Sequence, residues 1–245
     1  MTTENQEMLA QLGLLHDDMA QLPAEMRAVL AQSQAGYNAL SANLKNVVNT
    51  QMNFNVDIDP DELNPSNVSG GVFNSIGYAI DAAPRGALVT LNLLAGKEFF
   101  IDRGISLLGR QLYIKQKGVG DRPILNFVAT SDANFNHLYG FDTLGSESIT
   151  IHSVEIQLAD KVDPALPWSS LRSIVRYFST GVRIVSLTFC NLTGQGNTSI
   201  ASSVGAGISL ISLNGVIMDG AVYAVSAMPF GVAMISKQSV TLLNG

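Results

Sequence analysis

Histidine, cysteine and serine are the side chains of this sequence that could bind a metal or act as nucleophiles, and their spacing argues against both roles. His16, His137 and His152 are dispersed along the chain, whereas zinc sites use closely spaced ligands and catalytic triads need a base beside the nucleophile. Cys190 is the only cysteine, so a thiolate cluster and an intrachain disulfide are excluded. We expect no metal, no cofactor and no catalytic triad.

The best candidate for ligand binding is an insertion that contains two prolines and the only tryptophan, Trp168. Its indole ring is an amphipathic platform on which a sugar could stack, and Asp163 and Ser169 could supply hydrogen bonds. A second interpretation places Trp168 in an interface between chains. A nearby polar segment with His137 and Tyr139 is a further candidate for the same role.

The composition indicates an ordered chain with partners. Hydrophobic residues make up 47% of the 245 residues and charged residues only 14%, so much apolar surface must be covered, and other chains are the natural cover. The net charge is −6 and no cluster of Lys and Arg exists, which argues against nucleic acid as a ligand. The polar N-terminus does not fit a secretory signal, and no apolar run approaches about 18 residues, so we expect no membrane insertion.

Residues 1–50 are predicted to form a helical stalk. Thr3 and Gln6 fit a capping box, and the apolar residues that follow recur every 3.5 residues, which is the spacing of a coiled-coil seam. The seam consists of Met8, Leu12, Leu15, Met19, Leu22, Met26 and Val29. Pro23 interrupts this helix. It predicts either a kinked stalk or a helical hairpin.

Residues 51–70 are rich in Asp, Asn and Pro, and we expect them to be a linker. Beyond them, in residues 71–245, one pattern recurs: aliphatic, variable, aliphatic, variable, serine, aliphatic. The copies are 149–154, 182–187 and 208–213, with a partial copy at 240–244. Alternation predicts strands, and repetition without intervening helices predicts the stacked coils of a parallel β-helix.

The aligned copies give two further expectations. Ser153, Ser186 and Ser212 should form a ladder at a bend of the solenoid. Apolar runs near the C-terminus, 215–218, 221–225 and 228–235, should be covered by other chains at an interface, because the last run is more apolar than one buried strand face requires.

The beginning of the repeating domain has the helix-compatible run Ser75–Ile80, followed by short strand-like runs between glycines. These runs are Leu88–Leu91, Gly96–Ile101 and Ile105–Gly109. Over residues 70–245 the chain resembles the pectate-lyase-like, right-handed parallel β-helix of phage tailspikes and tail fibres. This resemblance implies a homotrimer, an N-terminus attached to the particle and a body that faces saccharide, but it does not imply catalysis.

Relatives that cleave polysaccharide use two carboxylates within about 5–10 Å. The aligned copies place Glu155, Thr188 and Asn214 in one outward row, in which one residue is acidic. The other candidates are expected in turns: Asp142, Glu147, Asp160, Asp163 and Asp219. We therefore expect binding without hydrolysis, and a depolymerase is the alternative.

The sequence thus predicts a mainly β protein, a right-handed parallel β-helix with a coiled-coil stalk. It would be a virion tail fibre or spike, assembled in the host cytoplasm. Its expected partners are two further copies of itself, tail or baseplate proteins through residues 1–50, and cell-surface polysaccharide or lipopolysaccharide. A second fibre protein at the C-terminal end is a further expected partner, in which case the chain would be an adaptor that mounts that fibre.

Overall fold

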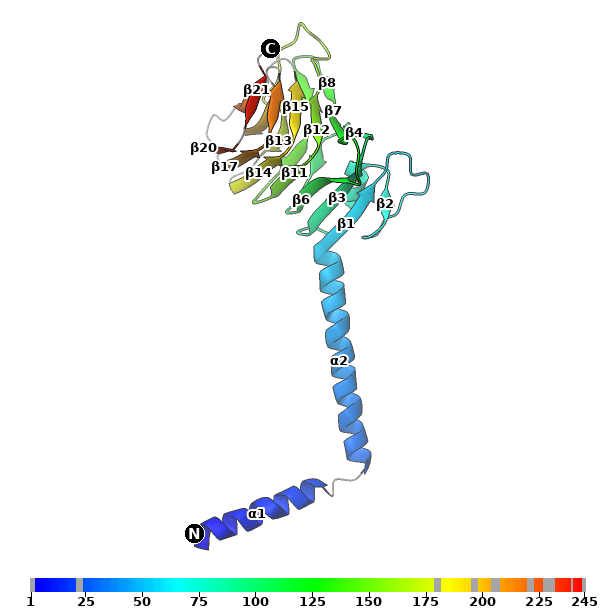
Figure 1. Ribbon diagram of the computed structural model, residues 1–245, viewed down its shortest axis with the longest axis vertical. Helices are drawn as coiled ribbons and strands as arrows, with labels where there is room; N and C mark the ends of the chain where they lie inside the picture. Colours follow the sequence, from blue (N-terminus) through cyan, green and yellow to red (C-terminus); the bar gives the residue numbers. More distant parts are fainter. Residues whose placement is uncertain are drawn as a thin grey trace. The chain divides into compact units, whose positions relative to one another are not determined.

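The computed structural model describes residues 3–20, 24–178, 182–194, 198–203, 208–219, 223–226, 232–238 and 240–243 (Figure 1). The chain divides into two compact units, Met1–Asn49 and Thr50–Gly245. Each unit is described by itself below.

The N-terminal unit is helical, as predicted. Helix α1 spans Thr3–Ala20, and helix α2 begins at Ala24 and ends at Met52. Pro23 lies outside the described residues, as does Leu22 of the predicted seam. Four seam residues are more than half exposed on the single chain, namely Met8, Leu12, Met26 and Val29. The side chains of Leu15 and Met19 are also outside the description.

The second unit contains three parallel sheets and one antiparallel hairpin. In spatial order, sheet A contains β2 (Val72–Phe73), β1 (Asn53–Ile58), β3 (Leu88–Leu94), β6 (Gln111–Lys117), β11 (Ser148–His152), β14 (Val182–Thr188), β17 (Ile208–Asn214) and β20 (Val232–Gln238). Sheet B contains β4 (Glu98–Ile101), β7 (Ile124–Phe127), β12 (Glu155–Leu158), β15 (Asn191–Gly194), β18 (Ile217–Asp219) and β21 (Thr241–Leu243). Sheet C contains β5 (Ile105–Ser106), β10 (Phe141–Thr143), β13 (Ser173–Tyr177), β16 (Ser199–Ser203) and β19 (Tyr223–Ser226). The hairpin joins β8 (Ala129–Ser131) to β9 (Asn136–Leu138).

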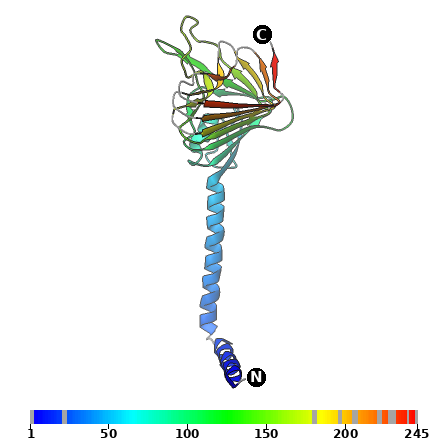
Figure 2. The same ribbon diagram turned by 90° about the vertical axis from the view of Figure 1, so that its left-hand side faces the viewer.

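The chain passes from sheet A to sheet B to sheet C and back to sheet A, so the strands stack as in a β-helix. For example, β11, β12 and β13 belong to the three sheets in turn, and β14 then returns to pair with β11. Figure 2 shows the strands of sheet A side by side, coloured from cyan to red. The prediction of stacked parallel coils is therefore confirmed.

Alternate residues of each strand point inward and form one continuous hydrophobic core. Helix α3 (Ile76–Ala82) adds Ile76, Ala79 and Ile80 to this core, and the predicted helix near residue 80 is confirmed. Cys190 is fully buried, and burial raises the pKa of its thiol. Cys190 thus packs as an apolar side chain of the core.

The prediction of a linker at 51–70 is wrong for its first half. Residues Asn53–Ile58 form β1, which pairs in parallel with β3. Phe54, Val56 and Ile58 alternate inward and are buried, so the short apolar alternation prevails over the turn-forming residues around it. The amide of Asn92 donates hydrogen bonds to Asn55 and Asp57 and fixes β1 to β3.

The predicted alignment of the repeats is wrong by three residues at its first step. Ile149 pairs with Val185 rather than with Val182, whereas Val182 does pair with Ile208 as predicted. An odd shift in a strand exchanges its inward and outward faces. Arg183 and Val185 consequently point inward, and Val182 and Ile184 are exposed.

A serine ladder exists, but it lies within the strands of sheet A rather than at a bend, and its members differ from the predicted ones. Ser186 pairs with Ser212, and Ser212 pairs with Ser236, but Thr150 rather than Ser153 pairs with Ser186. Ser153 instead adopts a left-handed backbone at the bend after β11, as Phe189 does one coil later. Gly215 occupies the next such bend with φ +61°, where a β-carbon would contact the Phe189 ring.

The partial repeat at 240–244 belongs to another sheet. Strand β21 pairs with β18 in sheet B, whereas β20 continues sheet A. The C-terminal interface was predicted partly from residues outside the description, including Val222. It therefore stays a prediction.

Candidate functional site

The predicted ligand-binding residues are brought together at the β8–β9 hairpin, where the insertion packs against β9. Asn136 fastens the insertion. Its amide nitrogen donates to the carbonyl oxygens of Asp163 and Leu166 at 2.8 and 3.0 Å, and its amide oxygen accepts from the Asp163 N–H at 2.9 Å. The backbone of Trp168 also forms a bridge with Asn136. Asn136 belongs to the polar segment of His137 and Tyr139 that the sequence marks as a second candidate for ligand binding, but its amide fixes turns instead.

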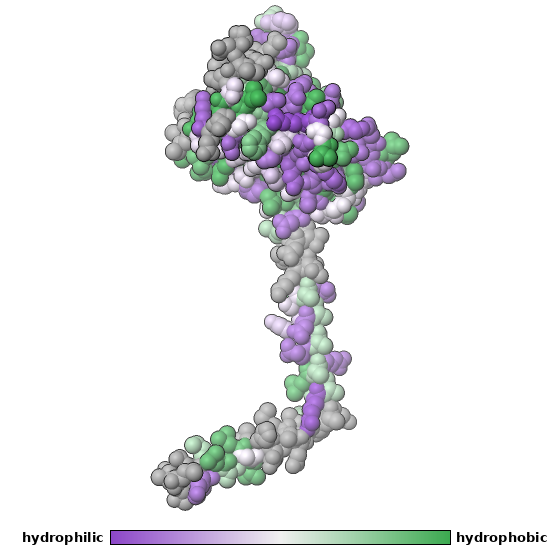
Figure 3. Space-filling model, viewed as in Figure 1, coloured by the Kyte–Doolittle hydropathy of each residue, from purple (hydrophilic) through white to green (hydrophobic). Residues whose placement is uncertain are grey.

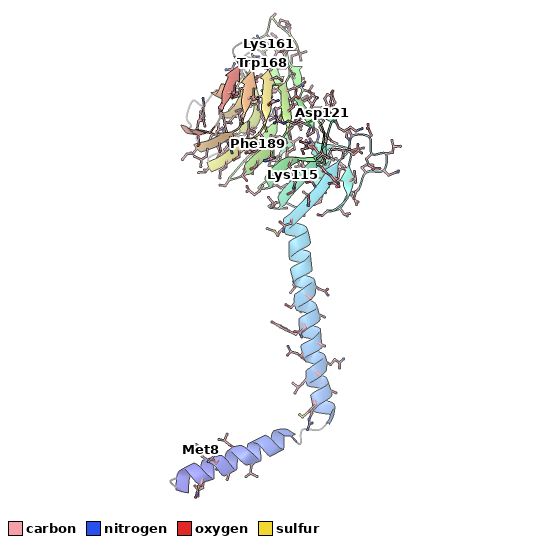
Figure 4. All side chains as sticks on the ribbon, in the orientation of Figure 1. Met8, Lys115, Asp121, Lys161, Trp168 and Phe189 are labelled. Atoms are coloured by element: carbon pink, nitrogen blue, oxygen red, sulfur yellow. The ribbon has the colours of Figure 1, made fainter. Side chains whose placement is uncertain are left out.

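The indole of Trp168 does not offer a face for stacking. Trp168 is only 8% exposed and belongs to the core of its own chain, so both expected positions, the exposed platform and the interface between chains, differ from what is observed (Figure 4). Asp163 and Ser169 use their side-chain oxygens to accept from the backbone N–H groups of Ala165 and Leu171. The polar groups of this insertion therefore stabilise its own turns.

His137 forms a hydrogen bond with Asp132 in the hairpin. The distance from His137 Nε2 to Asp132 Oδ2 is 2.8 Å, and Asp132 also accepts from the backbone N–H groups of Asn134 and Phe135. The N–H of Asn134, together with His137 and the N–H of Phe135, lowers the pKa of Asp132 to about 2. The Asp132 carboxylate fixes the hairpin turn. After the hairpin, the backbone N–H of Tyr139 donates to the carbonyl oxygen of Val128.

The outer face of sheet B presents two in-register rows of side chains, which the sequence analysis did not find. One row consists of Phe100, Asn126, Gln157 and Thr193, and the other consists of Glu98, Ile124, Glu155, Asn191 and Ile217. Neighbouring members of a row are about 4.8 Å apart because the strands are parallel and in register. The rows alternate with the inward residues that fill the core.

The first row lines a hollow of about 410 Å³, which Asp160 also borders. Phe100 is 55% exposed on it, and the Asn126 amide has no side-chain hydrogen bond within the described part of the chain. Gln157 donates to Glu155 at 3.2 Å and connects the two rows. An exposed ring beside the unpaired amide of Asn126 is suited to a ligand with both apolar and hydroxyl surfaces.

The second row borders a wider hollow of about 550 Å³. Arg122 lines it and donates from Nη1 to Asn191 Oδ1 at 2.9 Å, and Asp121 and Glu155 add carboxylates. Figure 3 shows hydrophilic atoms gathered in the part of this face where Figure 4 labels Asp121. We call the two hollows together the sheet B groove.

The predicted row of Glu155, Thr188 and Asn214 does not exist. Thr188 and Asn214 pair with one another in sheet A, next to His152, whereas Glu155 lies in sheet B between Ile124 and Asn191. Ile124 on β7 pairs with Glu155 on one side and with Glu98 of β4 on the other. Glu155 and Glu98 therefore lie in one row on the outer face of sheet B. Glu98 lies upstream of the three aligned copies, so their comparison did not include it.

Other chemistry is sparse within the described ranges. His152 Nδ1 lies 2.9 Å from the Ser153 hydroxyl, and the Phe189 ring packs on the imidazole. The described residues include no group of three His, Cys, Asp or Glu side chains placed to hold a metal ion. Among the described helices, none has the length and apolar character needed to cross a membrane.

Comparisons with family models, curated proteins and solved structures found no match to this chain. The functional argument therefore depends on the fold and on the sheet B groove.

Proposed function

We propose that this chain is a short spike or fibre of a phage-like particle and that its β-helix binds cell-surface saccharide. The observation that carries the proposal is the sheet B groove, in which exposed Phe100 adjoins the amides of Asn126 and Gln157. An apolar ring face and a row of amides match the C–H and hydroxyl surfaces of a sugar. We infer the right-handed form of the β-helix, since parallel crossovers are right-handed in about 98% of cases.

Binding to a polysaccharide tests this proposal. The full chain should bind a subset of bacterial capsule or lipopolysaccharide glycans on an array, and Phe100→Ala should raise Kd about tenfold, which corresponds to about 1.4 kcal/mol of lost stacking. Tyr113→Ala is the matched control, because this aromatic residue lies on the outer face of sheet A and should leave Kd unchanged. Absence of binding to every glycan would contradict the proposal.

Hydrolysis is the second candidate function, and the pair of Glu98 and Glu155 is the observation that favours it. Their strands flank β7, so their backbones are about 9.6 Å apart by strand spacing. Inverting glycosidases hold their carboxyl groups about 6.5–9.5 Å apart. We expect no new reducing ends from a bound polysaccharide. Their release by the wild type, with loss of activity in both E98Q and E155Q, would establish hydrolysis instead.

We propose further that the chain assembles as a homotrimer through residues 1–50, which would also attach it to other tail or baseplate proteins. The exposed seam of Met8, Leu12, Met26 and Val29 supports this proposal. A second apolar surface on β14 and β17, with Ile184 and Ile208 both more than 40% exposed, is of the kind that neighbouring copies cover.

Light scattering should therefore give a mass of three times 26.1 kDa. Leu12→Asp places a charge in the seam and should lower that mass. Leu14→Asp is its control, since Leu14 is 66% exposed and lies off the seam. A monomeric wild type would contradict the assembly, as would an equal effect of both substitutions.

A further inference from the structure

Arg183 is buried inside the solenoid, and no residue that the structure describes accepts a hydrogen bond from its guanidinium. It is 1% exposed, and its Nε, Nη1 and Nη2 atoms have no hydrogen-bond partner among the described residues. The other buried arginines of the second unit differ. Arg110 donates to the carbonyl oxygens of Ala83 and Leu107, and Arg176 pairs with Asp142.

Two further unpaired groups lie beside Arg183. The guanidinium carbon is 4.6 Å from the centre of the Tyr177 ring, and the Tyr177 hydroxyl is buried without a partner in the described structure. Ser209 is the neighbour of Arg183 on β17. Its side chain is fully buried, and its hydroxyl has no partner within the same ranges. One corner of the interior thus contains a cation and two hydroxyls that need acceptors.

The guanidinium remains charged at neutral pH. Burial lowers the pKa of Arg183 to about 10, and Tyr177 partly opposes this change, so the protonated form still dominates near pH 7. A buried cation without a counter-charge is strongly unfavourable. Backbone carbonyl oxygens supply acceptors to Arg110, whereas none of the described residues supplies one to Arg183, so a negative group at Arg183 would serve as both acceptor and counter-charge.

No carboxylate of the described residues pairs with Arg183. Glu147 lies one strand away, beside Arg183, because its neighbour Ser148 pairs with Ile184. Its two oxygens instead accept from the backbone N–H groups of Gly109, Leu144 and Gly145. The segments 179–181 and 204–207, which precede β14 and β17, contain neither Asp nor Glu.

We propose that Arg183, Tyr177 and Ser209 bind a small inorganic anion inside the β-helix, either a halide such as chloride or a small oxyanion. The guanidinium of Arg183 can only donate hydrogen bonds, and both hydroxyls can donate as well. A group that satisfies all three must therefore accept hydrogen bonds, and a negative charge on it would balance Arg183. Such an ion would neutralise Arg183 and satisfy the two hydroxyls together. It would be an internal structural ion, separate from the sheet B groove and independent of the saccharide proposal.

Thermal unfolding of the full chain tests the anion at constant pH and ionic strength. An inert large anion is replaced stepwise by chloride, nitrate or phosphate. Tm should rise by about 4 °C for each tenfold increase in the concentration of the anion that binds. The series also separates a halide site from an oxyanion site. Arg183→Met should abolish the dependence, and Arg122→Met, which alters an arginine of the sheet B groove, should retain it.

A bromide derivative of the wild-type crystal makes the test independent of the variants. An anomalous peak, or oxyanion density in the phosphate form, should lie within hydrogen-bond distance of Arg183 and Ser209. Water alone at this position, with a Tm that does not respond to any anion, would overturn the proposal. An anion response that persists in Arg183→Met would overturn it as well.

Discussion

Replacement of Glu147 by Ala should destabilise the second unit by about 3 kcal/mol. Glu147 is 2% exposed, and its carboxylate accepts from the backbone N–H groups of Gly109, Leu144 and Gly145 at 3.0, 3.2 and 2.7 Å. A buried donor that loses its acceptor costs about 1–3 kcal/mol, and the lower end applies to each of these three donors because Gly109 and Leu144 are exposed residues. Urea unfolding followed by fluorescence measures the loss, because Trp168 is the only tryptophan and is buried in this unit.

Glu98→Gln is the control for this substitution, since Glu98 lies exposed on the sheet B groove, and its effect should stay within about 0.5 kcal/mol. Equal destabilisation by both variants would contradict the role of Glu147.

The pH dependence of stability provides a second check. Burial, the largest effect, acts to raise the pKa of Glu147, but the backbone hydrogen bonds together outweigh it and lower the pKa below 4.5. The stabilisation by Glu147 is therefore complete above pH 4.5 and should be lost as the pH falls further.

The second large effect is expected at the buried pair of Asp142 and Arg176. Arg176 donates from Nε to Asp142 Oδ1 at 2.6 Å and from Nη1 to the Leu138 carbonyl at 3.1 Å. Gly104 leaves the space for this pair, because a β-carbon there would lie 2.6 Å from Arg176 Nη2. Asp142→Ala removes the counter-charge and should cost about 3–5 kcal/mol.

The pair itself should add little net stability. Burial raises the pKa of Asp142 in spite of Arg176, which means that ionisation of Asp142 is less favourable in the folded chain than in the unfolded chain. The double variant D142A/R176M should consequently recover most of the stability lost in D142A. Urea unfolding of the two variants compares them, and an additive loss in the double variant would contradict this explanation.

The sequence was sufficient to predict the parallel β-helix, because alternation and repetition depend on many residues at once. Val185 and Leu187 show that the pairing register of a strand was not predicted correctly. The strand Val182–Thr188 has aliphatic residues on both faces. Its pattern therefore fits two pairing registers, which place opposite faces of the strand inside. The shared serine favoured the wrong one, and a polar residue such as Arg183 was not expected inside. Register in a solenoid is set by coil lengths, which a six-residue pattern does not determine.

The candidate site was harder to predict for the same reason. Phe100, Asn126, Gln157 and Thr193 have no common sequence motif, and only the pairing of four strands places them in one row. Trp168 was the more conspicuous residue in the sequence. Its burial depends on Asn136, which fastens the insertion to the hairpin through contacts between residues 27 and 30 positions apart.

The central claim is that saccharide binds in the sheet B groove, and hydrogen exchange of the full chain with and without a glycan selected on the array tests it most directly. Bound glycan should slow exchange in β4, β7, β12 and β15, which line the groove, and Phe100→Ala should remove that protection. Protection confined to the β8–β9 hairpin and residues 160–170, or to none of these segments, would contradict the claim.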